Sequence, residues 1–189
     1  MIKFTFCLLL ALLSVAGSSF AGVYANLEFG DSRDVVQHKL KSSDMVEQTM
    51  PDTYIARTGL NGIFKCKTQL AGLTYHLYFN WNDDGNLHEI TLRSNKLERE
   101  DYKTSLYQAW KDAGKLLTQV YQAPAQNADY PNKNDLGDGS IMMSHIWHKG
   151  NNESILMGTG REQTSYFLTI RFINRHVKPI RIVTKNRQP

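Results

Sequence analysis

The chain has 189 residues, of which 41% are hydrophobic and 21% are charged, and its formal net charge is +4 at pH 7. This length suits one domain, or two small fused ones, and is enough to bury a core. Because the chain has only two cysteines, the fold has to be held together by packing and not by a disulfide framework.

Residues 1–21 have the three parts of a secretory signal peptide. Lys3 forms a short positively charged n-region, residues 4–15 form an apolar run, and Ser19 and Ala21 supply the small side chains that signal peptidase needs. The apolar run is too short to favour a membrane span. We therefore expect cleavage before Gly22 and a mature protein in the periplasm or outside the cell, with an uncleaved N-terminal anchor as the alternative.

The positions of the two cysteines bear on lipid attachment and on disulfide formation. No cysteine stands at the cleavage site, so an acylated lipoprotein is not expected, and Cys7 leaves with the signal peptide. Cys66 then remains alone and can form no internal disulfide. No later stretch is apolar enough to cross a bilayer, so we predict no transmembrane span after cleavage.

The first half of the mature chain, residues 22–97, is predicted to hold one helix and three strands. The segment "FGDSRDVVQHKL" has a capping residue, Asp31 or Ser32, followed by apolar residues one turn apart, which indicates a short helix. Residues 41–62 have little periodicity and are predicted to be an ordered connection without an element of its own. Apolar and polar residues alternate in 63–70, 73–81 and 87–92, which predicts a sheet with one buried face.

The second half, residues 98–175, repeats this layout. Apolar residues recur every three or four positions between Asn95 and Gln122, which predicts an amphipathic helix. A polar loop follows, and then strands over 141–148, 153–160 and 166–173. We predict an α+β fold of tandem α-β-β-β units with helices packed on an antiparallel sheet. An undivided α+β fold whose halves match by chance is the alternative.

The stretch "LTYHLYFNWNDDGNLHEITL" predicts a β-hairpin with Asp84-Gly85 as a two-residue turn. That register pairs Trp81 with His88, Phe79 with Ile90 and Leu77 with Leu92, so that the apolar residues share one face. Leu87 falls on the polar face, which indicates a bulge or a longer loop. The polar face is the expected partner surface, and its residues are Tyr78, Asn80, His76, Glu89 and Arg93.

The glycine, capping residue, valine and leucine of "FGDSRDVVQHKL", followed by strands that end in "LYFNWNDDGNLHEITL", carry a resemblance to known families. This part of the chain resembles the SmpA/OmlA-type outer-membrane lipoproteins and the β-lactamase inhibitor proteins. The resemblance covers Phe29 to Ser94, and the second half by layout alone. It implies a helix packed on an antiparallel sheet and a non-catalytic, protein-binding module outside the inner membrane. The chain lacks the acylated cysteine of the lipoproteins. In this respect it differs from the family, and a lipid anchor in the membrane is not expected.

The residues that could take part in catalysis or metal binding do not form a recognisable site. His145 and His148 are three apart on a predicted strand, so they point to opposite faces and cannot share a metal unless the strand bulges. Cys66 shares a strand face with Phe64 and Leu70, which favours burial as a small hydrophobe over a role as a nucleophile. The sequence contains no Gly-x-Ser-x-Gly nucleophile elbow, no phosphate-binding loop and no His-Glu-x-x-His zinc-protease motif. We predict no catalytic residue, no cofactor and no metal.

The C-terminal segment "RHVKPIRIVTKNRQP" is basic and contains no carboxylate side chain. We predict a basic tail over residues 176–189, either a solvated end or a contact for anionic lipid headgroups, lipopolysaccharide or an acidic partner. Interleaved apolar residues leave a final strand open as well. The expected anion-binding residues are Arg175, Lys178, Arg181, Lys185 and Arg187. Nucleic acid is not an expected ligand of an exported protein.

Together these features predict an exported, non-catalytic protein-binding or envelope-assembly module. A small exported hydrolase with an unrecognised active site is the alternative, and an envelope structural protein held by its basic tail is a third possibility. An enzyme needs a concave site with convergent polar groups, whereas a binder presents a flat or saddle-shaped aromatic surface.

Overall fold

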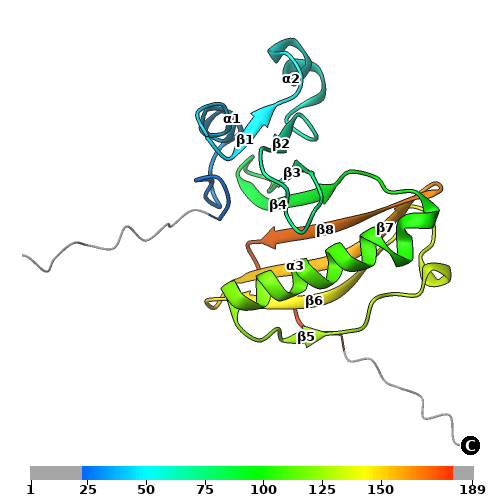
Figure 1. The fold of residues 1–189 in the computed structure, drawn as a ribbon. Helices are drawn as coiled ribbons and strands as arrows, with labels where there is room; N and C mark the ends of the chain where they lie inside the picture. The colour runs from blue at the N-terminus through cyan, green and yellow to red at the C-terminus, as the bar shows by residue number, and fades with distance from the viewer. Residues whose placement is uncertain (1–22, 181–189) are drawn as a thin grey trace, which may run out of the picture.

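A computed structural model describes residues 23–180, which form an α+β fold (Figure 1). The predicted signal peptide, its cleavage site and the tail residues Arg181, Lys185 and Arg187 lie outside the described residues. The helices are α1 (Arg33–Lys41), α2 (Asp52–Thr58) and α3 (Ser105–Tyr121), with 3-10 turns η1 (Arg99–Lys103) and η2 (Lys133–Asp135). The strands are β1 (Val46–Gln48), β2 (Phe64–Cys66), β3 (Tyr75–Trp81), β4 (Leu87–Ser94), β5 (Gln126–Asn127), β6 (Ile141–Lys149), β7 (Glu153–Glu162) and β8 (Ser165–Ile173).

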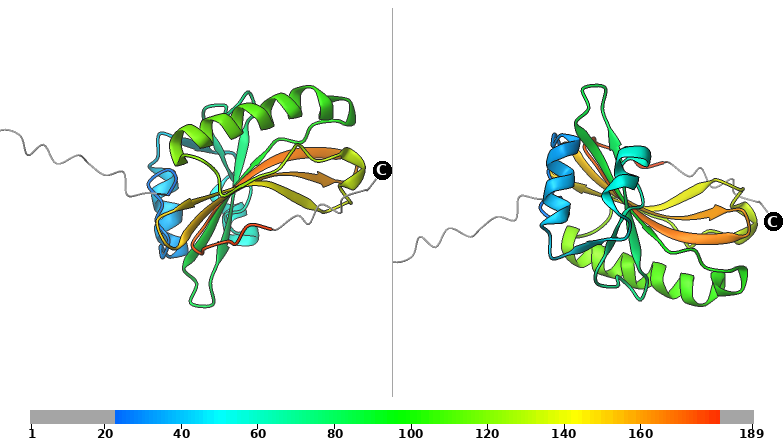
Figure 2. Two further views of the ribbon diagram at one scale, coloured as in Figure 1. Left: turned by 90° about the horizontal axis from the view of Figure 1, so that it is seen from below. Right: turned by 90° about the horizontal axis from the view of Figure 1, so that it is seen from above.

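The strands form one antiparallel sheet in the order β1-β2-β3-β4-β8-β7-β6-β5. Each half of the chain supplies four strands, and the two sets meet where β4 pairs with β8 along the middle of the sheet. Seen from below and from above, the strands of the two halves cross at a wide angle because the sheet twists (Figure 2). The predicted α+β class with an antiparallel sheet is confirmed, and the two halves share that sheet.

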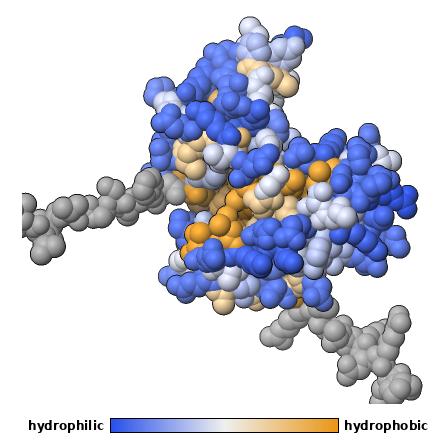
Figure 3. All heavy atoms as spheres, viewed as in Figure 1, coloured by the Kyte–Doolittle hydropathy of each residue, from blue (hydrophilic) through white to orange (hydrophobic). Residues whose placement is uncertain are grey.

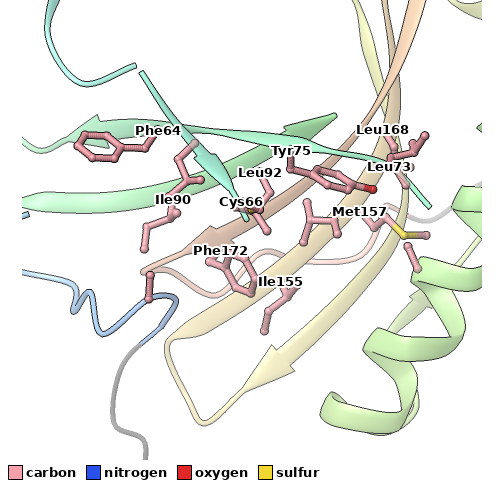
Figure 4. Close-up of a cluster of buried hydrophobic side chains, with 14 of the residues drawn as sticks. Phe64, Cys66, Leu73, Tyr75, Ile90, Leu92, Ile155, Met157, Leu168 and Phe172 are labelled. Atoms are coloured by element: carbon pink, nitrogen blue, oxygen red, sulfur yellow. The ribbon is translucent and has the colours of Figure 1, made fainter. Parts of the chain in front are cut away.

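One hydrophobic core lies between the sheet and the helices. Val36 and Leu40 of α1 and Leu106 and Leu117 of α3 belong to the same buried cluster. Figure 4 shows the sheet side of this cluster, where side chains from β2, β3 and β4 meet those of β7 and β8. Helices α1 and α3 therefore cover the same face of the sheet, and the two halves of the chain share one core.

The connection predicted over residues 41–62 is wrong, because it contains β1 and α2. Strand β1 has only three residues, which is too short for a visible alternation, although Val46 is buried and pairs with Cys66. Helix α2 buries none of its seven residues, so its sequence carries no apolar stripe. The positions of β1 and α2 therefore depend on strand pairing and on the neighbouring chain more than on a hydrophobic pattern in their own sequences.

The helix predicted between residues 95 and 122 is shorter than expected. Its first part is η1, and the backbone leaves helical geometry at Thr104, where φ is −114° and ψ is −94°. Val120, one of the apolar residues of the three- and four-residue pattern that predicted the buried side of this helix, is 64% exposed. At α1 the capping prediction is confirmed, since the Ser32 side chain accepts a hydrogen bond from the Val35 amide. The polar loop after α3 also contains the two residues of β5 and the turn η2.

The β3–β4 hairpin has the predicted pairing along most of its length. Phe79 lies opposite Ile90, but Trp81 lies opposite Leu87 and not His88, because a bulge follows Asn80. The two-residue turn is also wrong: the Gly85 amide donates to the Asn82 carbonyl, and Gly85 has a φ of +76°. The loop is therefore longer by one residue and ends in a left-handed glycine. The misfit at Leu87 indicated this bulge, which returns Leu87 to the core at 2% exposure.

Candidate functional site

The face of the sheet opposite α1 and α3, here called the open face, is crossed by one continuous row of paired residues. Starting at β1, each residue of the row lies directly opposite the next one. The row consists of Glu47, Lys65, His76, Arg93, Thr169, Gly158 and Met143. Its composition changes from charged residues on β1–β4 to small and apolar residues on β8–β6. The open face therefore has a polar half and an apolar half.

The five residues predicted as a partner surface all lie on the polar half. His76 pairs with Arg93 and Asn80 pairs with Glu89, while Tyr78 stands between them on β3. Asn80 is exposed, and His76, Tyr78 and Arg93 are half-buried. The structure thus brings the predicted residues together in adjacent cross-strand pairs, because alternation along two registered strands fixes their face.

Glu89 differs from the other four, because its side chain is not available to a partner. It is 5% exposed, and Arg171 on β8 donates to both of its carboxylate oxygens at 2.7 and 2.8 Å. Burial opposes ionisation of this carboxyl, but the hydrogen bonds from Arg171 and Thr91 outweigh it, so its pKa is lowered. Glu89 therefore joins β4 to β8 and stabilises the junction of the two halves.

Arg93 is the central residue of the polar half. Its guanidinium carbon lies 3.7 Å from the centre of the Phe167 ring and 6.0 Å from that of Tyr78. It also pairs with Glu162, whose second oxygen accepts a hydrogen bond from Lys96 at 3.0 Å. The guanidinium is thus held over an aromatic ring by charge and by stacking, with a quarter of its side chain exposed.

Phe167 was not predicted as part of this face. Its ring lies over Gly160 of β7, where an added Cβ would overlap the ring. Gly158, two residues earlier, has the Met143 sulfur 2.8 Å from the position of an added Cβ. Two glycines at alternate positions of a strand mark a close approach of neighbouring groups, and the "GTG" of β7 was the signal available in the sequence.

The apolar half of the open face is covered by the segment 175–180, here called the C-terminal strap. Ile146, Leu156 and Ile173 form a second buried cluster on this half, and Val177 of the strap packs against it. The strap begins at Arg175 and reaches the edge strand β5, where the Ile180 amide donates to the Gln126 side chain. Residues 176–180 of the predicted tail are therefore docked on the sheet, although they form no strand.

The basic residues predicted to bind anions fall into two groups. Arg175 and Lys178 lie in the strap with exposed side chains, so the docked segment presents both cations on the open face. The other three predicted residues follow the strap and lie outside the described residues.

A buried serine and histidine lie side by side on the helix-covered face, at a bulge in β6. The bulge around Ser144 turns both Ser144 and His145 toward α3, and Ser144 Oγ lies 2.9 Å from His145 Nδ1. Trp110 Nε1 donates to the same hydroxyl at 2.9 Å. Burial lowers the pKa of His145, and both side chains are less than a tenth exposed. This pair is packed beneath α3, where a substrate has no access.

Cys66 is buried, as predicted, and its Sγ atom lies 2.9 Å from the Tyr24 hydroxyl. Burial raises the pKa of the Cys66 thiol, which disfavours the thiolate that a nucleophile needs. His145 faces the core and His148 faces the open side, as their spacing predicted. Among residues 23–180, no three side chains of histidine, cysteine or acidic type are grouped closely enough to hold a metal ion.

Figure 3 shows apolar side chains gathered in a hollow between the two halves, on the side of α3. A small hollow in the described residues is lined by Val23, Phe29, Tyr121, Phe172 and their neighbours. It has room for about one water molecule, far less than a small-molecule site requires. Within the same residues, no helix combines the length and the apolar character that a membrane crossing needs. Comparison of the chain with family models, curated proteins and solved structures gives no match.

Proposed function

We propose that the protein is an exported, non-catalytic module that binds a protein partner, or helps to assemble the cell envelope, through the polar half of its open face. One observation carries this proposal: Arg93, held over Phe167, lies opposite His76 and near Tyr78 on a sheet face that neither α1 nor α3 covers. Arginine and tyrosine are among the residue types that contribute most at protein interfaces. Because stacking and ion pairing fix the guanidinium beforehand, little side-chain freedom is lost when a partner binds.

The geometry of the described residues supports this proposal better than it supports a small exported hydrolase. The buried Ser144–His145 pair and the raised pKa of Cys66 argue against a nucleophile at either place. The resemblance to the SmpA/OmlA-type lipoproteins and the β-lactamase inhibitor proteins points the same way. One sheet built from two halves is compatible with that resemblance, which stays part of the proposal.

A second candidate function is attachment to an anionic envelope surface, because the strap presents Arg175 and Lys178 and leads directly into the remaining basic residues. Cations in a segment without carboxylates are attracted to phosphate-bearing lipids or lipopolysaccharide at low salt. This function would hold the protein at its place of work, whereas the polar half would contact the partner. The two functions use different halves of the open face and can operate together.

The partner surface is tested with a photo-reactive amino acid placed at Asn80, which is exposed on the polar half, in protein exported by living cells. The matched control carries the same group at Val120, which is exposed on the opposite side of the molecule, on α3. A specific cross-linked partner from Asn80, lost on Arg93→Ala and not formed from Val120, is expected. Cross-linking that is equal from both positions, or independent of Arg93, would contradict the proposal.

Export is tested separately by mass spectrometry of the mature protein. The proposed processing gives Gly22 as the first residue. A mature chain that retains residues 1–21, or that carries an acyl group, would contradict the proposed localisation.

A further inference from the structure

The C-terminal strap is fastened to the sheet only through side chains of the sheet. Ser154 Oγ donates to the Arg175 carbonyl and accepts from the Val177 amide, both at 2.9 Å. His148 Nε2 donates to the Val177 carbonyl at 3.0 Å, and the Gln126 side chain accepts from the Ile180 amide at 2.9 Å. No backbone-to-backbone hydrogen bond joins residues 175–180 to any described strand. The strap can therefore leave without breaking the hydrogen-bond ladder of the sheet.

Detachment of the strap would change the surface, because the strap covers apolar side chains. Ile146, Leu156 and Ile173 are each at most 5% exposed, and Val177 packs against them. These three residues belong to β6, β7 and β8 and lie on the apolar half of the open face. Without the strap, these three apolar side chains would face solvent.

A second histidine lies beside His148, which holds the strap through its hydrogen bond to the Val177 carbonyl. The rings of His148 on β6 and His176 in the strap have their centroids 4.0 Å apart. Since a carbonyl only accepts hydrogen bonds, Nε2 of His148 carries the hydrogen of its bond to Val177. Imidazole is the side chain that ordinarily gains charge between pH 8 and pH 5, and two charged rings at this distance repel each other.

The groups around this pair do not offset such a repulsion. The strap adds the cations Arg175 and Lys178 and no carboxylate. On the neighbouring strands, Glu89 is bonded to Arg171, and Glu153 is paired with Lys149 and lies in the hollow on the α3 side. Ser154 and Gln126, the other two fastenings, are neutral. Among the described residues no ion pair includes either histidine.

We propose that the strap is an acid-released cover: protonation of His148 and His176 detaches residues 175–180 and bares the apolar half of the open face. The device lies on the other half of the face from the proposed partner surface, so it does not depend on that surface. Mild acid would therefore expose apolar side chains that the strap covers at neutral pH. At neutral pH the same apolar residues stay covered, which limits unspecific association.

The strap is tested by backbone NMR relaxation on the full mature chain between pH 7.5 and pH 5.5. The heteronuclear NOE of the Val177 and Ile180 amides should fall from the values of ordered backbone to those of a free chain end as the pH is lowered. The amide of Ile90 in the central strand β4 should keep its value throughout, because it monitors the intact fold.

Two variants make this test specific. His176→Gln keeps a polar side chain without a titrating charge, and its strap should stay ordered at both pH values. His38→Gln, an exposed position on α1, should behave like the wild type. If the strap stays ordered at pH 5.5 in the wild type, or is released equally in His176→Gln, the proposal is wrong. Loss of the Ile90 signal would mean that acid unfolds the whole protein, which also overturns a selective release.

Discussion

The ring of Phe167 on β8 lies over Gly160 on β7, and the guanidinium carbon of Arg93 lies 3.7 Å from the centre of the same ring. The stack therefore runs from the sheet backbone through an aromatic ring to a charged group. It exists because glycine leaves the backbone bare at this position, as in the aromatic covering of strand glycines. Gly160 thus supports Arg93, the central residue of the proposed partner surface, without touching it.

Gly160→Ala should destabilise the protein by about 2–3 kcal/mol, because the new methyl group would overlap the Phe167 ring and force it to move. Urea unfolding measures this free energy. The matched control is Gly137→Ala, where an added Cβ meets only the Ser140 hydroxyl at 3.8 Å and the cost should stay below about 0.5 kcal/mol. Equal costs at both positions would mean that Phe167 is not packed on Gly160.

The assignment of faces in the β3–β4 hairpin predicts opposite outcomes for two neighbouring residues. Phe79→Ala should cost about 3–5 kcal/mol, since Phe79 is 2% exposed in the core. Asn80→Ala should cost less than about 0.5 kcal/mol, because Asn80 is exposed on the open face. Urea unfolding of the two variants tests the register, and a reversed order would contradict it.

Glu89→Gln should lower the free energy of unfolding by about 2 kcal/mol at pH 7, because it breaks a nearly buried ion pair with Arg171. The pKa of Glu89 is lowered in the folded state, so its contribution is present above the usual glutamate range. It is lost as the pH falls through the lowered folded pKa. The cost of the substitution should therefore shrink as the pH is lowered from 5 toward 3.

The pH dependence distinguishes the ion pair from simple packing. Unfolding is measured in urea at each pH, with Glu28→Gln as the control at an exposed position. That control should change stability by less than about 0.5 kcal/mol at neutral pH. A cost for Glu89→Gln that stays constant down to pH 3 would show that the charge of Glu89 contributes nothing.

These residues also show what the sequence can and cannot predict. The pairing of Phe79 with Ile90 follows from strict alternation, because a slip by one residue would turn every apolar side chain outward. The burial of Glu89 could not be predicted, since its partner Arg171 lies on a strand 82 residues later in the chain. The same holds for the strap: Val177 looks like part of a charged tail until β6 and β7 place Ile146 and Leu156 beneath it. Both the burial of Glu89 and the docking of the strap depend on contacts between residues far apart in the sequence. The local pattern of apolar and polar residues does not reveal such contacts.

Cys66 should react with a thiol reagent only when the protein unfolds. Its side chain is 6% exposed, it is hydrogen-bonded to Tyr24, and burial raises the pKa of its thiol. The labelling rate at pH 8, followed by mass spectrometry, should rise steeply across the urea transition. Rapid labelling in native buffer would place the thiol at the surface and reopen a nucleophilic role.

The basic C-terminus should hold the protein weakly at anionic membranes. Each cation near such a surface contributes on the order of 1 kcal/mol, and the attraction decays within a Debye length. We expect the mature protein to float with vesicles of anionic phospholipid at low salt, but not with zwitterionic vesicles. At 0.5 M salt, where the Debye length is roughly 4 Å, it should be released.

Two truncations separate the charges from the strap. Deleting residues 181–189 removes Arg181, Lys185 and Arg187 but leaves the strap, so vesicle binding should weaken severalfold while the melting temperature stays unchanged. Deleting residues 175–189 also uncovers Ile146, Leu156 and Ile173, so the melting temperature should fall as well. Flotation and thermal unfolding measure the two effects independently. If the shorter truncation binds vesicles as strongly as the full mature chain, the cations after Ile180 are only a solvated end. Attachment would then have to rest on Arg175 and Lys178.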